Sequence, residues 1–148
     1  MKKIILLIFI SCGFLSACKS TKNTANTNTE TTPNASKLSG TWELNYISGK
    51  RIAFDGLYPD KKPQINFNLT ESELGGNTSC NGFGSKMVID GNKITISEPF
   101  AKTMIFCEGE GENSFLDMLK KVNSYSVTND NTLTFSMGDI AVMRFVKK

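Results

Sequence analysis

The chain has 148 residues, enough for one ordinary domain and a short extension. Hydrophobic residues make up 39% and charged residues 21%, close to the globular average, which excludes a wholly disordered or fibrous protein. Histidine is absent, which excludes a Ser-His-Asp triad, a Cys-His pair and any zinc site that needs imidazole. Four cysteines are too few to define a disulfide-dense scaffold.

Residues 1–17 have the layout of a bacterial lipoprotein signal peptide. Met1-Lys2-Lys3 carries positive charge, and the apolar run at 4–14 is too short to span a hydrocarbon core, which needs about 20 residues. The segment Leu15-Ser16-Ala17-Cys18 then resembles a lipobox, in which the cysteine receives a diacylglycerol thioether, with acyl chains such as palmitate, before cleavage in front of it. We therefore expect a lipidated Cys18, with an ordinary signal peptide as the alternative.

A lipidated Cys18 predicts a durable membrane anchor, because two or three acyl chains hold a protein on a bilayer where a single chain does not. Lys19 follows it, at the position where an aspartate often marks inner-membrane retention in enterobacterial lipoproteins. The lysine favours the outer membrane, and the absence of an acidic run after Cys18 favours its periplasmic face over the cell surface. We therefore expect a protein of the bacterial cell envelope.

Residues 18–37 comprise the lipidated cysteine and a tether rich in Thr and Asn. This tether has almost no apolar surface to bury, so we expect it to be disordered, with an r.m.s. span of about 25 Å. The remaining part, 38–148, carries 12 basic and 13 acidic residues, a net charge of −1. A domain with this balance lacks the basic surface that nucleic acids require, so we expect no nucleic-acid partner.

From residue 38 onward, apolar side chains mostly alternate with polar ones, which is the pattern of half-buried antiparallel strands. Turn signals separate the expected strands at 90–92, 129–131 and 138–139, and a longer loop is expected around 55–63. The clearest alternations place these residues on shared faces: Trp42, Leu44 and Tyr46; Ile65, Phe67 and Leu69; Ile94 and Ile96; Tyr125 and Val127; Leu133 and Phe135; and Ile140, Val142 and Arg144 opposite Ala141, Met143 and Phe145.

One segment has helical periodicity instead. Within 112–122, Phe115, Leu119 and Val122 fall on one helical face. Acidic residues lie at the start of this segment and basic ones at its end: Glu108, Glu110 and Glu112, then Lys120 and Lys121. This placement suits the helix dipole, and we prefer that explanation of the three glutamates to a weak divalent-cation site. We predict a mainly β fold, a small antiparallel barrel-like sheet with one α-helix near the C-terminal third that caps an open end.

Three motifs follow one another along the folded part: Gly40-Thr41-Trp42-Glu43-Leu44, then Gly75 to Gly84 with Ser79-Cys80-Asn81-Gly82-Phe83 inside it, then Thr103-Met104-Ile105-Phe106-Cys107 before the helix. Together they resemble the META domain family, also called HslJ-like, over residues 38–148. The chain departs from the family pattern at Ser79, where glycine is usual, and at Phe106, where a small residue is common.

The resemblance implies a small barrel-like β fold with one helix, found often in bacterial envelope lipoproteins and linked in some members to heat shock or stress. The family has no established molecular activity, and it offers no catalytic or cofactor residues to transfer. The motif residues that the resemblance marks as structural are Trp42, Asn81, Phe83 and Thr103. We therefore expect no enzyme activity, no cofactor and no metal site.

Two cysteines, Cys80 and Cys107, remain once Cys12 is cleaved away and Cys18 is lipidated. An even pair in an exported domain indicates a disulfide, with unpaired thiols or a redox pair as alternatives. The pair lacks Cys-x-x-Cys spacing, which disfavours a thioredoxin-like role. The resemblance makes their proximity expected, although the bulky Phe106 could hold Cys107 away from its partner.

Two further patterns are assigned structural roles. The glycines of the central motif lead into a strand rather than a helix, so bulges and close sheet crossings explain them better than a phosphate cradle does. Glu71 and Glu73 are expected to share one strand face at a solvated edge rather than to form an acid–base pair.

The leading functional hypothesis is a monomeric, non-enzymatic envelope lipoprotein that binds another envelope component or supports the envelope under stress. The alternative is a small-ligand or peptide binder that uses the mouth of the barrel. A deep apolar cavity would favour the ligand binder, whereas a filled barrel with an exposed apolar patch would favour a protein partner.

Overall fold

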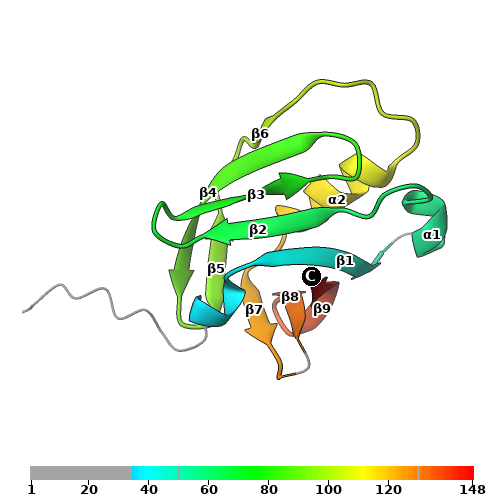
Figure 1. Ribbon diagram of the computed structural model, residues 1–148. Helices are drawn as coiled ribbons and strands as arrows, with labels where there is room; N and C mark the ends of the chain where they lie inside the picture. The colour runs from blue at the N-terminus through cyan, green and yellow to red at the C-terminus, as the bar shows by residue number, and fades with distance from the viewer. Residues whose placement is uncertain (1–34, 50, 130) are drawn as a thin grey trace, which may run out of the picture.

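The computed structural model describes residues 35–49, 51–129 and 131–148 (Figure 1). The expected signal peptide, Cys18 and most of the expected tether lie outside the described residues. The described chain begins with a 3₁₀ helix, η1 (Ala35–Leu38), in which Ala35 and Leu38 are buried. Because these two side chains join the fold, residues 35–37, which the sequence analysis assigned to the tether, form part of η1.

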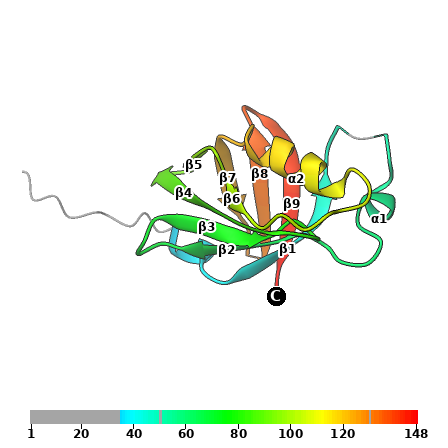
Figure 2. The same cartoon turned by 90° about the horizontal axis from the view of Figure 1, so that it is seen from above.

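Within the described residues, nine antiparallel strands form one sheet, which closes into a barrel where β3 pairs with β4. The closed ring has the order β3-β2-β1-β9-β8-β7-β5-β4, and the short β6 pairs beside β4. The strands are β1 (Thr41–Ile47), β2 (Gln64–Asn68), β3 (Glu73–Asn77), β4 (Gly82–Asp90), β5 (Lys93–Ile96), β6 (Ala101–Lys102), β7 (Ser124–Val127), β8 (Thr132–Met137) and β9 (Ile140–Lys147). Two views at right angles show them wrapped around one interior (Figures 1 and 2), so the predicted mainly β, barrel-like fold is confirmed.

The main helix, α2 (Gly111–Leu119), lies in the segment where the helical period predicted it. It ends at Leu119, and Val122 is buried just beyond it rather than in its last turn. The ring of Phe115 meets that of Phe83 on β4, with centroids 5.5 Å apart. The helix therefore packs its apolar face into the barrel core, which is what the spacing of its apolar residues required.

A second, short helix, α1 (Phe54–Leu57), lies in the expected loop and was not predicted, because a single turn leaves no period to detect. The buried Tyr58 follows it and donates its hydroxyl hydrogen to the Gly111 carbonyl (3.0 Å), which joins α1 to the start of α2. Burial raises the pKa of Tyr58 to about 12. Over the described ranges, no helix combines the length and the apolar character needed to cross a membrane.

The barrel interior is filled by large side chains. Phe135 packs edge-on against Phe145, with ring centroids 5.4 Å apart, and against Phe67 at 6.4 Å. Trp42 is fully buried and donates its indole N–H to the Leu38 carbonyl (2.7 Å), which ties η1 to the core. Other fully buried large residues are Leu44, Ile65, Leu74, Ile94, Phe115, Leu119, Leu133 and Met143.

A β-bulge in β1 corrects the predicted orientation of Tyr46. The pairing with β9 passes from Leu44 to Tyr46 and leaves Asn45 without an opposite residue. An extra residue reverses the inward and outward order of the side chains that follow it. Ile47 is therefore buried in place of Tyr46, which is 39% exposed and packs against the Arg144 guanidinium, 5.3 Å from the ring centroid.

A second bulge lies in β9. The pairing with β8 passes from Met143 to Ala141, so Val142 has no opposite residue. Both Val142 and Met143 are buried as a result, while Ile140 before the bulge is 62% exposed. The strict alternation expected along this strand therefore fails at the bulge.

Replacing Trp42 with alanine should lower the free energy of unfolding by about 3–5 kcal/mol, because it empties a large buried site and removes an indole hydrogen bond. Tyr46→Ala, on the exposed side of the same strand, should cost about 1 kcal/mol or less. Urea denaturation followed by circular dichroism measures both variants. Equally small losses of unfolding free energy in the two variants would show that Trp42 contributes little to the stability of the core.

Candidate functional site

The turn between β3 and β4, residues 78–81, carries the central motif. Its closing bonds are local: the Thr78 N–H donates to the Asn81 carbonyl (2.8 Å), and the Asn81 N–H donates to the Thr78 hydroxyl (3.0 Å). Ser79 has a positive φ of 87°, and its N–H donates to the side-chain oxygen of Asn77 (3.2 Å). These bonds hold the turn while Thr78 and Asn81 are buried.

The Asn81 side chain joins this turn to two other segments. Its Oδ1 accepts hydrogen bonds from the Thr103 hydroxyl (2.7 Å) and the Ile105 N–H (2.9 Å). Its Nδ2 donates to the Ile105 carbonyl (3.0 Å) and to Glu112 Oε2 (2.8 Å), and lies 3.0 Å from Cys107 Sγ. Because both backbone groups of Ile105 bond to one buried side chain, the segment before α2 is fixed in place.

Glu112, in the first turn of α2, is a buried carboxylate that is 9% exposed. Its Oε2 accepts hydrogen bonds from the Thr78 hydroxyl and the Asn81 amide, both 2.8 Å, and its Oε1 accepts one from the Lys102 ammonium (2.7 Å). Burial opposes ionisation, but the donors Lys102, Asn81 and Thr78 outweigh it and hold the pKa of Glu112 below its ordinary value. The sequence analysis explained Glu112 only by the helix dipole and did not predict these hydrogen-bond partners.

Cys80 and Cys107 form a disulfide, with Cα atoms 6.1 Å apart, within the range that the bond requires. Cys80 lies in the β3–β4 turn and Cys107 in the irregular segment before α2, so neither cysteine is on a strand. Phe106 does not keep Cys107 away from its partner, because its side chain is directed outward and is 86% exposed. The bond ties the turn to the entrance of the helix.

Cys80, Cys107 and Glu112 offer three potential ligand atoms within 4.8 Å of one another. While the two sulfurs are bonded to each other, neither is the thiolate that a metal ion needs. The arrangement is therefore a disulfide beside an ionised carboxylate.

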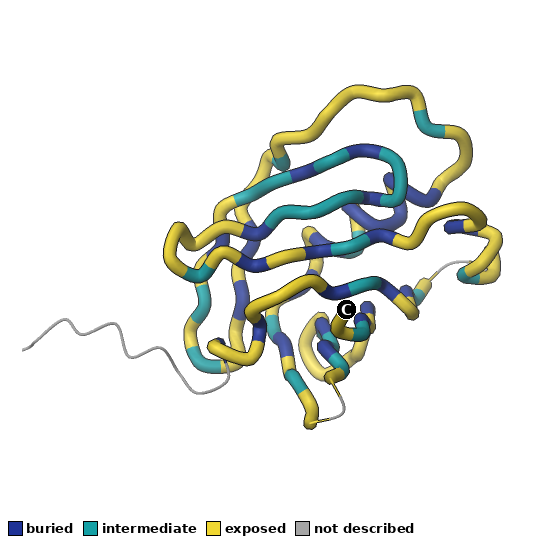
Figure 3. Tube along the Cα trace, in the orientation of Figure 1, coloured by how far each residue is buried: buried dark blue, intermediate teal, exposed yellow. Residues whose placement is uncertain are grey.

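Residues 104–106, which we call the apolar loop, expose three consecutive apolar side chains. Met104 is 85% exposed, Ile105 65% and Phe106 86%. Figure 3 shows them in the long exposed segment that leads from β6 to α2, interrupted only near Cys107. The loop is fixed at its centre by Asn81 and at its end by the disulfide, so its side chains are held out to solvent.

A hollow of about 320 Å³ lies over the disulfide, between the apolar loop and the segment that follows α1. Both half-buried cysteines line it, together with Phe106. The other lining residues are Leu57, Tyr58, Pro59, Asp60, Lys61, Ser79 and Glu108. The hollow therefore combines an accessible sulfur–sulfur bond with an apolar wall and a charged rim.

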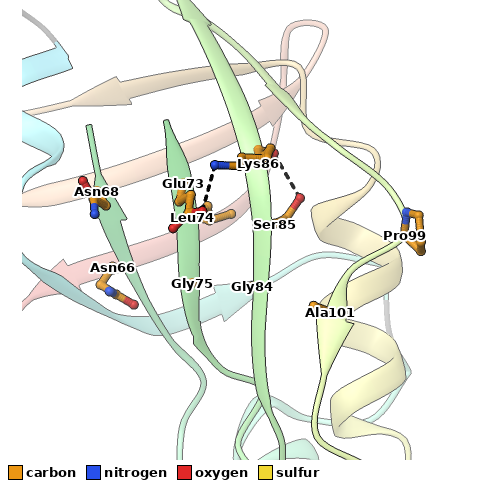
Figure 4. Close-up of a pocket in the computed structure, with 10 residues that line it drawn as sticks. All are labelled: Asn66, Asn68, Glu73, Leu74, Gly75, Gly84, Ser85, Lys86, Pro99 and Ala101. Carbon is orange, nitrogen blue, oxygen red and sulfur yellow. Dashed lines mark hydrogen bonds and ion pairs between the residues drawn. The ribbon is translucent and has the colours of Figure 1, made fainter. Parts of the chain in front are cut away.

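A second hollow, of about 510 Å³, lies on the outer face of β2, β3 and β4 (Figure 4). Its floor is a row of small residues, Gly75 opposite Gly84 and Gly84 opposite Ala101. Glu73 and Lys86 on its side form an exposed ion pair (2.8 Å). Its charged side chains are thus already paired with each other, and no aromatic ring is among its lining residues.

Two expectations about this region of the sheet are resolved by the backbone. Gly76 has a positive φ of 152°, and a Cβ there would collide with the Gln64 carbonyl, so a close crossing explains this glycine as predicted. We expected Glu71 and Glu73 to share a strand face, and this prediction is wrong, because Glu71 lies in the turn before β3.

The structure brings some of the expected motif residues together and leaves one apart. Asn81 and Thr103 are hydrogen-bonded, and the Phe83 ring packs against Phe100 and Phe115. Trp42 belongs to the core beside η1. The sequence analysis missed Thr78, Lys102 and the true partners of Glu112, because nothing in the sequence shows which distant donors face a helix terminus.

Fold and site together define a closed antiparallel barrel with a cross-linked polar cluster between one turn and one helix. The sequence model of the META domain matches residues 36–148, and the chain belongs to this family, as its motifs predicted. No curated protein matches the chain.

Solved structures of the same fold have little sequence identity with the chain. A protein from Burkholderia xenovorans, solved by NMR, has a TM-score of 0.60 at 12% identity, covering 88% of this chain and 99% of its own. A crystal structure of a duf4847 family protein from Bacteroides vulgatus has a TM-score of 0.55 at 16% identity, covering 76% of this chain and 94% of its own. At these identities the likeness concerns the fold alone.

Glu112→Gln should lower the free energy of unfolding by about 1.5–3 kcal/mol at neutral pH, because it removes charged hydrogen bonds in a buried cluster. The folded pKa of Glu112 is depressed, so this contribution is present above the ordinary value of 4.5 and is lost as the pH falls through the folded value. The difference in the free energy of unfolding between wild type and variant should therefore shrink as the pH falls below 4.5.

Glu73→Gln is the matched control, because Glu73 also pairs with a lysine but in solvent, where such pairs contribute about 0–1 kcal/mol. Urea denaturation across this pH range measures both variants. A Glu112→Gln loss that stays constant down to the lowest pH would contradict the proposed charge contribution.

Proposed function

We propose that the chain is a non-enzymatic lipoprotein of the bacterial envelope whose META domain docks a protein partner through the apolar loop, residues 104–106. The observation that carries the proposal is the exposure of Met104, Ile105 and Phe106 on a fixed backbone. The proposed anchor is the lipidated Cys18, and the proposed location is the periplasmic face of the outer membrane.

The fixed backbone is what distinguishes the apolar loop from scattered surface hydrophobic residues. Three consecutive apolar side chains would ordinarily fold back to reduce their contact with water. Asn81 and the disulfide prevent this by holding the loop from below and at its end. A loop that is already ordered loses little conformational freedom on binding, which favours association.

The filled barrel supports a protein partner over a ligand in the barrel mouth. Large side chains such as Trp42, Phe135 and Phe145 occupy the interior and are fully buried. The apolar surface that could bind a partner is therefore outside the barrel, beside the hollow of about 320 Å³ that one inserted side chain of a partner could enter.

The charges around the apolar loop indicate the chemistry of the partner. Asp60, Glu108 and Glu110 are exposed near it, against Lys61 and against Lys102, whose charge is paired with Glu112. We propose a partner surface with an apolar pocket and a basic rim, because opposite charges at the rim of an interface favour encounter. An anionic lipid surface is disfavoured by the same acidic rim.

The position of the apolar loop agrees with a protein partner rather than a lipid surface. In both ribbon views, η1 and the segment between β6 and α2 lie at opposite ends of the domain (Figures 1 and 2). A tether leading to η1 would attach the domain to its membrane at the η1 end. The apolar loop would then face away from the proposed anchor and towards other envelope proteins.

Photocrosslinking in cells tests the docking role, with a photoreactive residue at Met104 in the full chain. Phe106→Ser and Ile105→Ser should each reduce the crosslinked product more than tenfold, because a central apolar residue contributes about 2 kcal/mol or more to an interface. Ile140→Ser is the matched control, since Ile140 is 62% exposed against 65% for Ile105 but lies on β9. Equal yields from all three variants would overturn the proposal.

Replacing Cys18 with serine tests the anchor. The full chain should move from the membrane fraction to the periplasmic fraction, because acyl chains are what hold it to the bilayer. Cell fractionation followed by immunoblotting measures the change. A Cys18→Ser protein that still sediments with membranes would refute the lipoprotein assignment.

A further inference from the structure

We propose that the Cys80–Cys107 disulfide is exchangeable and oxidises a dithiol carried by the protein that docks at the apolar loop. Both sulfur-bearing residues line the hollow of about 320 Å³ and are half-buried rather than enclosed in the core. The identity of the substrate protein rests on the docking role proposed above, whereas the reactivity of the disulfide does not.

The two sulfurs have different surroundings, which assigns the one that is attacked. Cys107 Sγ lies 3.0 Å from Asn81 Nδ2 and 3.5 Å from Glu112 Oε2. Cys80 Sγ has looser polar contacts, 3.8 Å to the Phe106 carbonyl and 3.9 Å to Asn81 Nδ2. An incoming thiolate is repelled by the carboxylate beside Cys107, so it attacks Cys80.

The same surroundings suit Cys107 to be the leaving group. Both hydrogens of Asn81 Nδ2 are already donated, to the Ile105 carbonyl and to Glu112 Oε2, so the charge on the leaving sulfur is removed by protonation. As the sulfur–sulfur bond breaks, Cys107 Sγ takes up the proton that the partner thiol released and donates a hydrogen bond to Glu112 Oε2, 3.5 Å away. Lys102 balances the charge of Glu112 from its other side. Asn81 and Glu112 are thus positioning residues for the cysteine pair.

The exchange is balanced as two substitutions at sulfur. A thiolate of the partner attacks Cys80 Sγ, the bond to Cys107 breaks, and Cys107 takes up the proton that the partner thiol released. The second partner thiol loses its proton to solvent and attacks the partner sulfur of the mixed disulfide, and Cys80 leaves and is protonated. The partner dithiol loses two electrons and two protons, and the disulfide of this chain gains them.

The apolar loop supplies the selectivity that the sulfur chemistry lacks. Phe106 is next to Cys107 in the chain, and its carbonyl lies 3.8 Å from Cys80 Sγ. A polypeptide whose apolar residues pack on the loop therefore brings a neighbouring cysteine to the hollow. We expect dithiols within apolar polypeptide segments to react faster than small polar dithiols at equal concentration.

Two matched variants of the full chain test which sulfur reacts. Cys107→Ser leaves Cys80 free, and Cys80→Ser leaves Cys107 free, and both lose the same cross-link. With a synthetic peptide disulfide of apolar sequence, Cys107→Ser should form the mixed disulfide at least tenfold faster, because Glu112 favours the protonated thiol at Cys107. Mass spectrometry of quenched samples measures the adduct. Equal rates, or a faster Cys80→Ser protein, would overturn the assignment.

The wild-type chain tests the exchange itself, with a reduced apolar peptide carrying two cysteines and with dithiothreitol. One equivalent of chain should oxidise one equivalent of peptide, and Phe106→Ser should slow the reaction with the peptide at least tenfold more than the reaction with dithiothreitol. Ile140→Ser should change neither rate. A disulfide that oxidises neither dithiol refutes the exchange and leaves the docking proposal intact. Exchange that is insensitive to Phe106→Ser refutes only the claim that the apolar loop selects the substrate.

Discussion

The buried carboxamide of Asn81 holds together three parts of the chain that the barrel alone does not join. It bonds the β3–β4 turn to Thr103 and Ile105 and to the first turn of α2 through Glu112. Glu112 is itself buried, so removing the carboxamide leaves a buried carboxylate with one donor fewer. The outward direction of the apolar loop and the contact between sulfur and carboxylate both depend on this one side chain.

Periodicity predicted the fold because most strands of a small barrel have one buried and one exposed face. The prediction failed where the backbone adds a residue, as at Asn45, since a bulge leaves no mark in the alternation of the sequence. It also missed α1, which is shorter than the period by which helices are found. These errors change individual side chains and leave the barrel order unaffected.

The candidate site was predictable only in part. The motif containing Cys80 and Asn81 and the motif ending in Cys107 indicated which segments were special, but not why. The role of Glu112 depends on donors separated from it by 10 residues (Lys102), 31 residues (Asn81) and 34 residues (Thr78), and only the closed barrel brings them together. The exposure of Phe106 was likewise unpredictable, because an apolar residue beside a cysteine is ordinarily expected to be buried.

The pairing of β1 with β9 makes the ring depend on the two ends of the folded part. Thr41 accepts a hydrogen bond from the Lys148 N–H (2.9 Å), and β9 lies between β1 and β8 in the described sheet. A ribosome must therefore synthesise the last strand before the ring can close, and contacts between such distant residues form slowly. The ring therefore stays open for as long as the nascent chain is being synthesised.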